Sequence, residues 1–139
     1  MFQNLISNLP WLHVLVAAAA YFVLGAIWYG PLFSKAWIRG HRINVNDPDA
    51  KKGVAAIMIG SFVLFFLICV AQQILLSVAM VNTLESGVKW GLFVGFGFAV
   101  TTLSITNLYL KKPASIHLID GLYHVTGLTI ASIIMAVWK

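Results

Sequence analysis

Four apolar stretches, each long enough to cross a lipid bilayer as a helix, make up most of the chain. They cover residues 11–29, 54–81, 88–110 and 116–138. A hydrocarbon core of about 30 Å requires about 20 apolar residues in helical form. The stretches are too continuously apolar for barrel strands, which alternate over about 10 residues. The pattern therefore predicts an all-α polytopic membrane protein, in which four transmembrane helices form a compact bundle and a single domain, 1–139.

The segment 31–47, between the first two stretches, carries a helical pattern of its own. Phe33 and Trp37 are four residues apart, and Lys35 and Arg39 repeat that spacing on another face. Side chains four apart lie on the same side of a helix. We therefore expect a short amphipathic helix at the membrane interface, either as an anchor or as a docking or gating element.

Three helix starts are predicted from capping residues. Small polar side chains accept hydrogen bonds from the free N–H groups of a first turn, and a Glu three positions later can complete a capping box. We expect Asn82 with Glu85 to begin the third membrane helix. The second should begin at Asp47 with Pro48, and the fourth at Ser115.

Composition strengthens the membrane interpretation and excludes several protein classes. The 139 residues are 60% hydrophobic and 9% charged, whereas soluble domains contain about 25% charged residues. The net charge is +5, but the basic residues flank the apolar stretches, so lipid and not nucleic acid is the expected partner. No phosphate-binding glycine loop, hydrolase elbow or zinc-protease motif occurs, and no cofactor is expected.

The basic residues also predict an orientation. Seven fall between the first and second stretches or between the third and fourth, and two, Lys89 and Lys139, fall on the other side. Loops rich in Lys and Arg stay in the cytoplasm. Both termini should therefore face outward, into the periplasm if this is a bacterial inner membrane. The seven residues are Lys35, Arg39, Arg42, Lys51, Lys52, Lys111 and Lys112.

Small residues mark the faces on which the helices should pack. Gly91, Gly95 and Ala99 repeat every four residues on the third helix, and the fourth carries Gly121 and Gly127. Such stripes let helix backbones approach closely in lipid. They suit packing within the bundle or between subunits of a homo-oligomer. Four helices leave little central space, so a pore would have to form between subunits.

Two segments give the chain a family resemblance. The first is Trp28-Tyr29-Gly30-Pro31-Leu32-Phe33, continued by Ser34-Lys35-Ala36-Trp37. The second is Asp120-Gly121-Leu122-Tyr123-His124, followed by an apolar run and Trp138. Together they resemble a family of small four-helix membrane proteins of bacteria and fungi, described as a domain of unknown function. The resemblance covers essentially the whole chain. It implies four spans and an integral membrane location, and it supplies no activity and no catalytic residues.

Ionisable residues inside the fourth stretch are the main functional clue. His117, Asp120 and His124 share one helical face, and the opposite face, with Ile119, Val125 and similar residues, is expected to contact lipid. Ionisable groups within a membrane span are costly and often functional. Asp120 and His124, one turn apart, are expected to form a hydrogen-bonded pair that can relay protons. Residues at similar depth that can join this site are Tyr29, Thr106, Asn107 and Tyr109.

A polar route across the membrane is one hypothesis for this site, and two other hypotheses compete with it. The route would combine Gln73, Thr102, Asn107, Asp120 and His124. Alternatively, the polar residues only hold helices together, each contributing roughly 1 kcal/mol. As a further alternative, His124 and Asp120 bind a metal ion with a third ligand from another helix.

Three functions follow from these hypotheses. The first is a small oligomeric channel or transporter for protons or small cations. The second is a non-catalytic membrane module that binds a partner protein, a lipid or a small apolar ligand. The third is a metal-dependent membrane enzyme, which ranks last because a histidine-rich metal centre needs more ligands than His124 and Asp120 provide. An ordinary hydrolase is not expected, since Asp120 is the one carboxylate left for acid–base work.

Overall fold

The computed structural model describes residues 1–138 and is all-α, as predicted. Four runs are long and apolar enough to span a membrane: Trp11–Leu32, Val54–Val78, Leu84–Tyr109 and Ala114–Val137. The elements are α1 (Phe2–Ser7), α2 (Trp11–Ile27), α3 (Ser34–His41), α4 (Val54–Val78), α5 (Leu84–Val94), α6 (Thr101–Tyr109) and α7 (Ala114–Val137). Two π-helical segments, η1 (Trp28–Leu32) and η2 (Gly95–Val100), continue α2 and join α5 to α6.

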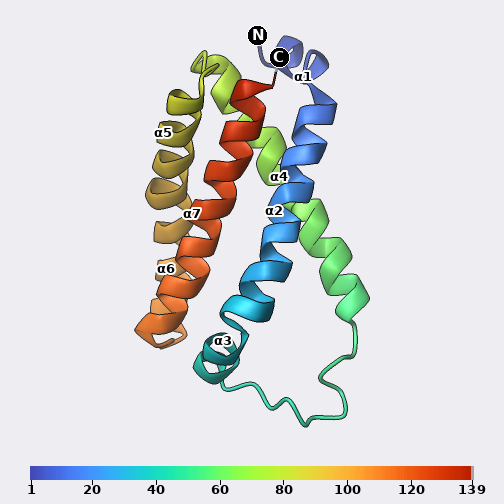
Figure 1. Ribbon diagram of the computed structural model, residues 1–139, viewed down its shortest axis with the longest axis vertical. Coiled ribbons are helices and arrows are strands. Elements are labelled where there is room, and N and C mark those ends of the chain that lie inside the picture. Colours follow the sequence, from blue (N-terminus) through green and yellow to red (C-terminus); the bar gives the residue numbers. More distant parts are fainter. Residues whose placement is uncertain (139) are drawn as a thin grey trace.

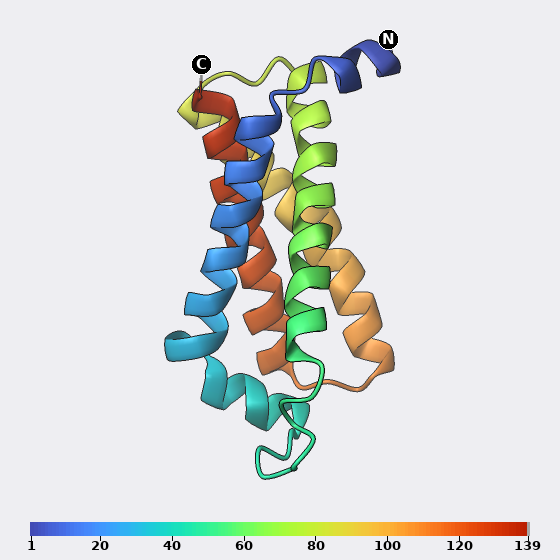
Figure 2. The same cartoon turned by 90° about the vertical axis from the view of Figure 1, so that its right-hand side faces the viewer.

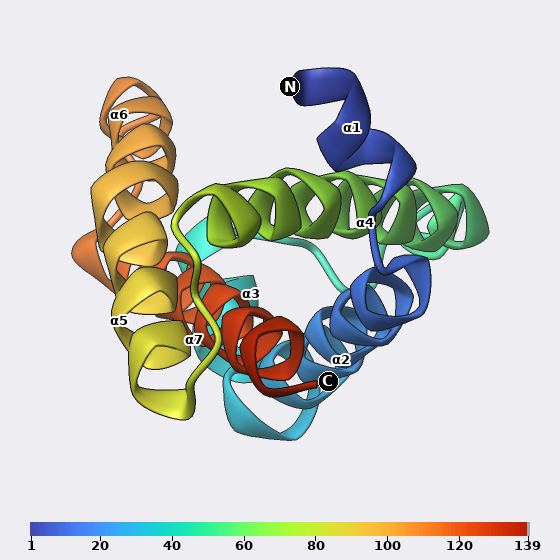
Figure 3. The same cartoon turned by 90° about the horizontal axis from the view of Figure 1, so that it is seen from above.

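The four spans run up and down, and α7 lies at the centre of the bundle (Figure 1). It packs against α5 and η2 on one side and against α2 and α4 on the other, as the view along the bundle shows (Figure 3). Both chain ends lie at one end of the bundle, and α3 and the loop 42–53 lie at the other (Figure 2). That second end holds the seven basic residues grouped by the sequence, and we call it the basic end. Lys139 is outside the described residues.

The central place of α7 overturns the prediction of its lipid-facing side. Ile119 and Val125 were expected to face lipid, but they are 7% and 5% exposed. A helix surrounded by three others has no wide lipid face. The exposed apolar residues of α7 are few, and Leu122 at 43% is one of them. The core instead joins α7 to α2 and α4 through Val14, Ala17, Ala18, Tyr21, Cys69, Leu76, Tyr123, Leu128, Ala131 and Met135.

Small residues hold α5 and η2 close to α7 within one chain. A Cβ at Gly91 would overlap the backbone of Thr129, and a Cβ at Gly95 would lie 2.9 Å from the Cα of Val125. The stripe on the third span therefore packs inside the bundle. Gly127 of α7 faces the other way, because a Cβ there would overlap the ring of Tyr21 on α2. Gly121 has more room, since its Cβ would meet Val100 at 3.5 Å. Ala99, the third member of the stripe, is half-buried.

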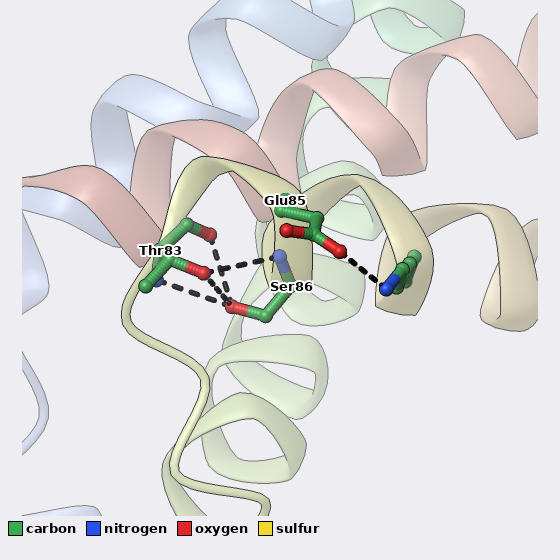
Figure 4. A network of polar contacts seen from close by, with 4 residues as sticks. Thr83, Glu85 and Ser86 are labelled. Carbon is green, nitrogen blue, oxygen red and sulfur yellow. Dashed lines mark hydrogen bonds and ion pairs between the residues drawn. The ribbon is translucent and has the colours of Figure 1, made fainter.

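The predicted helix starts are displaced by a few residues. Thr83 caps α5, and its side chain and that of Ser86 form the capping box predicted for Asn82 and Glu85 (Figure 4). Glu85 instead pairs with Lys89 one turn later.

The other two starts also differ from the capping prediction. Helix α4 begins after Gly53, whose φ is +75°. Asp47 lies earlier in the loop, where it accepts a hydrogen bond from the N–H of Asp49 and closes a turn. Helix α7 begins at Ala114 after Pro113, so Ser115 lies inside its first turn and caps nothing.

We expect Gly91→Ala to lower the free energy of unfolding by about 1–3 kcal/mol, because the added methyl group forces the backbones of α5 and α7 apart. Gly97→Ala is the matched control, since nothing lies within 4 Å of a Cβ at that position. Thermal unfolding of the purified variants in detergent measures both. Equal stability of the two variants would contradict the close α5–α7 contact.

Candidate functional site

Asp120 is the centre of a hydrogen-bonded cluster near the basic end. Its Oδ1 accepts a hydrogen bond from the hydroxyl of Tyr29 at 2.7 Å and another from the Nε1–H of Trp37 at 3.1 Å. The Nε2 of His41 lies 3.7 Å from Oδ2, so protonation of that imidazole forms an ion pair. The side chain of Asp120 is 13% exposed. We call Tyr29, Trp37, His41 and Asp120 the carboxylate cluster.

The sequence builds this cluster by folding α3 back onto the start of α7. Pro31 has no N–H and interrupts the helical hydrogen bonds, so the chain leaves α2 through the wider turn of η1. Trp37 and His41 are four residues apart on α3 and so present both rings to one side, with ring centroids 4.5 Å apart. Gly40 allows close contact, because a Cβ there would lie 2.5 Å from the side chain of Ile116.

A second set of contacts, next to the carboxylate cluster, joins α2 and the start of η1 to α7. The hydroxyl of Tyr21 lies 2.6 Å from Nδ1 of His124, and the hydroxyl of Tyr123 donates to the carbonyl of Tyr21 at 3.1 Å. Trp28 donates its Nε1–H to the carbonyl of Ile119 at 3.0 Å. These bonds satisfy polar groups that lipid cannot hydrate. They fix α2 against α7 over two turns.

Polar contacts therefore recur along one row of α7, four residues apart. Asp120 and His124 are followed by the carbonyl of Leu128 and the hydroxyl of Ser132, both of which accept hydrogen bonds from Gln72 of α4. We call Asp120, His124, Leu128 and Ser132 the α7 polar row. Ala17 and Ala18 of the neighbouring α2 lie along the part of this row from His124 to Ser132, and both are fully buried and apolar.

The predicted site is assembled only in part. Tyr29 meets Asp120 as expected, but Asp120 and His124 do not pair with each other, because each binds a different tyrosine of the first span. His117 is half-buried and makes no side-chain hydrogen bond within residues 1–138.

Within residues 1–138, the residues of the proposed polar route do not come together either. Thr102 is exposed on the outside of α6. Gln73 is buried and donates to Ser77 on its own helix, and Asn107 is buried with Nδ2 unpartnered in the described chain. Gln73 lies on α4, and Thr102 and Asn107 lie on α6, and these two helices pack on different sides of α7. The sequence did not reveal that α7 lies between them. Thr106 and Tyr109, expected at similar depth, are exposed as well.

Four residues of the site were missed or underrated in the sequence. In the sequence, Tyr21 lies within the first apolar stretch and Trp28 within the segment that carries the resemblance. Trp37 lies on the amphipathic segment, and His41 follows it four residues later. The four-residue spacing of Trp37 and His41 was the available signal, since it placed both on one face of the predicted short helix. Nothing local marked Tyr21, whose role depends on how α2 and α7 pack.

The donors around Asp120 do not make a metal site. No group of three or more His, Cys, Asp or Glu residues comes together within residues 1–138. The two closest neighbours of the carboxylate are a phenol and an indole N–H, and an indole N–H only donates. The arrangement fits a hydrogen-bonded junction of three helical elements.

The comparison with known protein families gives one match, which covers most of the chain. Residues 12–136 match the model of the family described as Protein of unknown function (DUF1761). The chain belongs to the DUF1761 family. No curated protein and no solved structure matches it significantly. The matched range includes residues 28–37 and 120–124, which carried the resemblance, and Trp138 lies just beyond it. The structure brings these two segments together, because Tyr29 and Trp37 of the first bind Asp120 of the second.

In this DUF1761 chain, a cavity of about 390 Å³ lies next to the carboxylate cluster, between α2 and α4. Its wall is mostly apolar and aromatic, and Tyr29 belongs both to this wall and to the cluster. The other lining residues are Phe22, Gly25, Ala26, Gly30, Met58, Ser61, Phe65 and Tyr123. We call this space the α2–α4 cavity.

We expect Asp120→Ala to release α3 from the bundle, because Tyr29 and Trp37 lose their shared acceptor. Each buried donor left without a partner costs about 1–3 kcal/mol. Hydrogen exchange followed by mass spectrometry should show faster exchange of the amides of Ser34–His41, while α5 is unchanged. Asp49→Ala is the matched control, since Asp49 is exposed and its carboxylate binds nothing in residues 1–138. Unchanged exchange in α3 would show that the carboxylate does not hold it.

Proposed function

We propose that this integral membrane protein binds a small lipid-like ligand in the α2–α4 cavity. The observation that carries the proposal is the cavity itself, which lies between two membrane-spanning helices. It lies close to Asp120, because Tyr29 of its wall donates a hydrogen bond to that carboxylate. Its volume of about 390 Å³ falls within the range of small-molecule sites, about 300–1,000 Å³. The chain would be a binding module and not an enzyme.

The lining favours a ligand that is apolar along most of its length. Phe22, Met58 and Phe65 supply apolar contact area, and methionine adapts to ligands of different shape. The two tyrosine hydroxyls at the wall are already engaged, Tyr29 with Asp120 and Tyr123 with the carbonyl of Tyr21. They therefore offer little further hydrogen bonding to a guest.

One polar group remains available in the lining. Ser61 is half-buried on α4, and its hydroxyl makes no hydrogen bond within residues 1–138. A hydroxyl both donates and accepts. The cavity therefore suits an alkyl or isoprenoid chain, or a small ring compound, that carries a single polar group near Ser61.

A photoreactive fatty acid with a diazirine in its chain should label the α2–α4 cavity of the protein in nanodiscs. After irradiation, cross-links mapped by mass spectrometry should concentrate on residues 22–30 and 58–65, and an excess of unreactive fatty acid should reduce them. We expect Ser61→Phe to lower this labelling about tenfold, because overfilling a site costs about 1–3 kcal/mol.

Val63→Phe is the matched control, since Val63 lies on the exposed side of α4 and outside the cavity lining. Labelling that is equally strong on exposed residues such as Phe96 and Phe98 of η2, and insensitive to Ser61→Phe, would contradict a specific cavity. That outcome would mean that the probe only reports contact with bulk lipid.

Transport of protons or small cations is the second candidate, and the α7 polar row favours it. Its ionisable members, with Tyr29, His41 and Tyr21, extend from the basic end into the membrane. Buried apolar residues of α2 separate His124 from the other end, so a complete route would need an assembly of several copies. The positive-inside rule places the basic end in the cytoplasm under this proposal.

Asp120→Asn separates the two candidates. The amide oxygen still accepts from Tyr29 and Trp37, so assembly should be kept, but an amide cannot take up or release a proton. If the protein transports protons, a pH-sensitive dye inside liposomes should report flux with the unaltered protein and none with Asp120→Asn. Asp49→Asn should leave that flux unchanged. No flux in correctly folded, reconstituted protein would remove the transport candidate and leave ligand binding untouched.

A further inference from the structure

A second and larger concavity lies at the basic end, lined by α3, the turn before α7 and the start of α7. Its volume is about 790 Å³, and it is bounded by the second half of α3, by residues 110–113 and by the first turn of α7. Five of its lining side chains carry or can acquire positive charge: Arg39, His41, Arg42, Lys111 and Lys112. We call this concavity the basic pocket. It shares no lining residue with the α2–α4 cavity.

Most of the positive charge of the basic pocket has no carboxylate close to it within the described chain. Arg39, Arg42, Lys111 and Lys112 have no carboxylate within 4.0 Å in residues 1–138. The one carboxylate close to a lining residue is Asp120, beside His41, and it already accepts two hydrogen bonds. Like charges gathered around a concave surface raise the local potential and concentrate anions.

Helix dipoles explain part of this arrangement but not its shape. Arg39 and Arg42 lie at the C-terminal end of α3, and Lys111 and Lys112 follow the end of α6, where cations interact favourably with the helix dipole. That effect operates separately at each helix end. It does not require two distant helix ends to direct their cations into one shared concavity.

The first turn of α7 adds to the attraction for an anion. Pro113 precedes the helix and provides no side-chain cap, and Ser115 lines the basic pocket. The N–H groups of a first turn carry partial positive charge. The N–H of Ile116 already donates to the carbonyl of Pro113, which leaves those of Ala114 and Ser115 at the helix start. A negatively charged group in the pocket would therefore meet four Arg and Lys side chains and an uncapped helix start.

We propose that the basic pocket binds the phosphate group of an anionic ligand. Arginine donates two parallel N–H bonds that match phosphate oxygens, and lysine adds flexible point charges. The pocket lies at the end of the apolar spans, at the depth where phospholipid headgroups are found. The phosphate can belong to an anionic lipid headgroup or to a soluble phosphate compound, and the experiment separates these two sources.

Binding should be measured by isothermal titration of the full-length protein in a zwitterionic detergent. The probes are dihexanoyl phosphatidylglycerol, dihexanoyl phosphatidylcholine and inorganic phosphate, each titrated separately. We expect saturable binding of the anionic lipid that weakens as the salt concentration rises. The double variant Arg39→Ala/Lys112→Ala should weaken binding by at least about tenfold, since hydrogen bonds to charged groups contribute about 1.5–3 kcal/mol.

Lys51→Ala/Lys52→Ala is the matched control, because it removes the same charge from the same end but outside the pocket. Thermal unfolding of each variant confirms that it is folded, and Arg39→Lys, which keeps the charge, should retain part of the affinity. Binding of phosphatidylglycerol lost only in the pocket variant assigns the site to a lipid headgroup. Binding of inorganic phosphate without the lipid assigns it to a soluble compound. No binding of either probe, or equal loss in both double variants, would overturn the proposal.

Discussion

The structure at the basic end depends on one requirement, that a carboxylate within an apolar bundle must have hydrogen-bond donors. Asp120 obtains them from Tyr29 at the end of the first span and from Trp37 on α3. Without those donors the carboxylate would lose hydration and gain nothing in return. The need to satisfy Asp120 therefore brings α3 back across the end of the bundle. It also fixes the ring of Tyr29, and with it one wall of the α2–α4 cavity.

The central place of α7 is the second determinant of the fold. Gly91 and Gly95 let the third span approach α7 on one side, and Gly127 accommodates Tyr21 on the other. In lipid the association of helices relies on close packing and on polar contacts more than on the hydrophobic effect. Here close glycine contacts occur on both sides of α7. Toward α2, α3 and α4 they are joined by side-chain hydrogen bonds.

The sequence predicted the number and type of the spans because each is long and continuously apolar. It also predicted the helix at 34–41 from the spacing of Trp37 and its neighbours. It could not predict which helix is central, because apolar residues face both lipid and protein neighbours, and so Ile119 and Val125 were assigned to the wrong environment. Thr83 and Ser86 replaced the predicted cap because Asn82 and Thr83 are both good capping residues, and the local sequence does not choose between them.

The candidate site also combines residues that the local sequence indicates with residues that only tertiary packing reveals. Tyr29 and Asp120 were both chosen, since an ionisable residue in a span is informative by itself. The partners Tyr21 and His41 were not, because they lie 103 and 79 positions from His124 and Asp120, and such pairs depend on tertiary packing.

The use of one oxygen of Asp120 by two donors has a consequence for how the three residues can vary. Tyr29 and Trp37 do not make separate bonds whose energies add, because each donor polarises and orients the acceptor that the other one uses. Removing either donor changes the strength of the bond that remains, and removing the acceptor breaks both. Tyr29, Trp37 and Asp120 therefore form an energetically coupled unit. In sequences that share this junction, the three should be exchanged together and not one at a time.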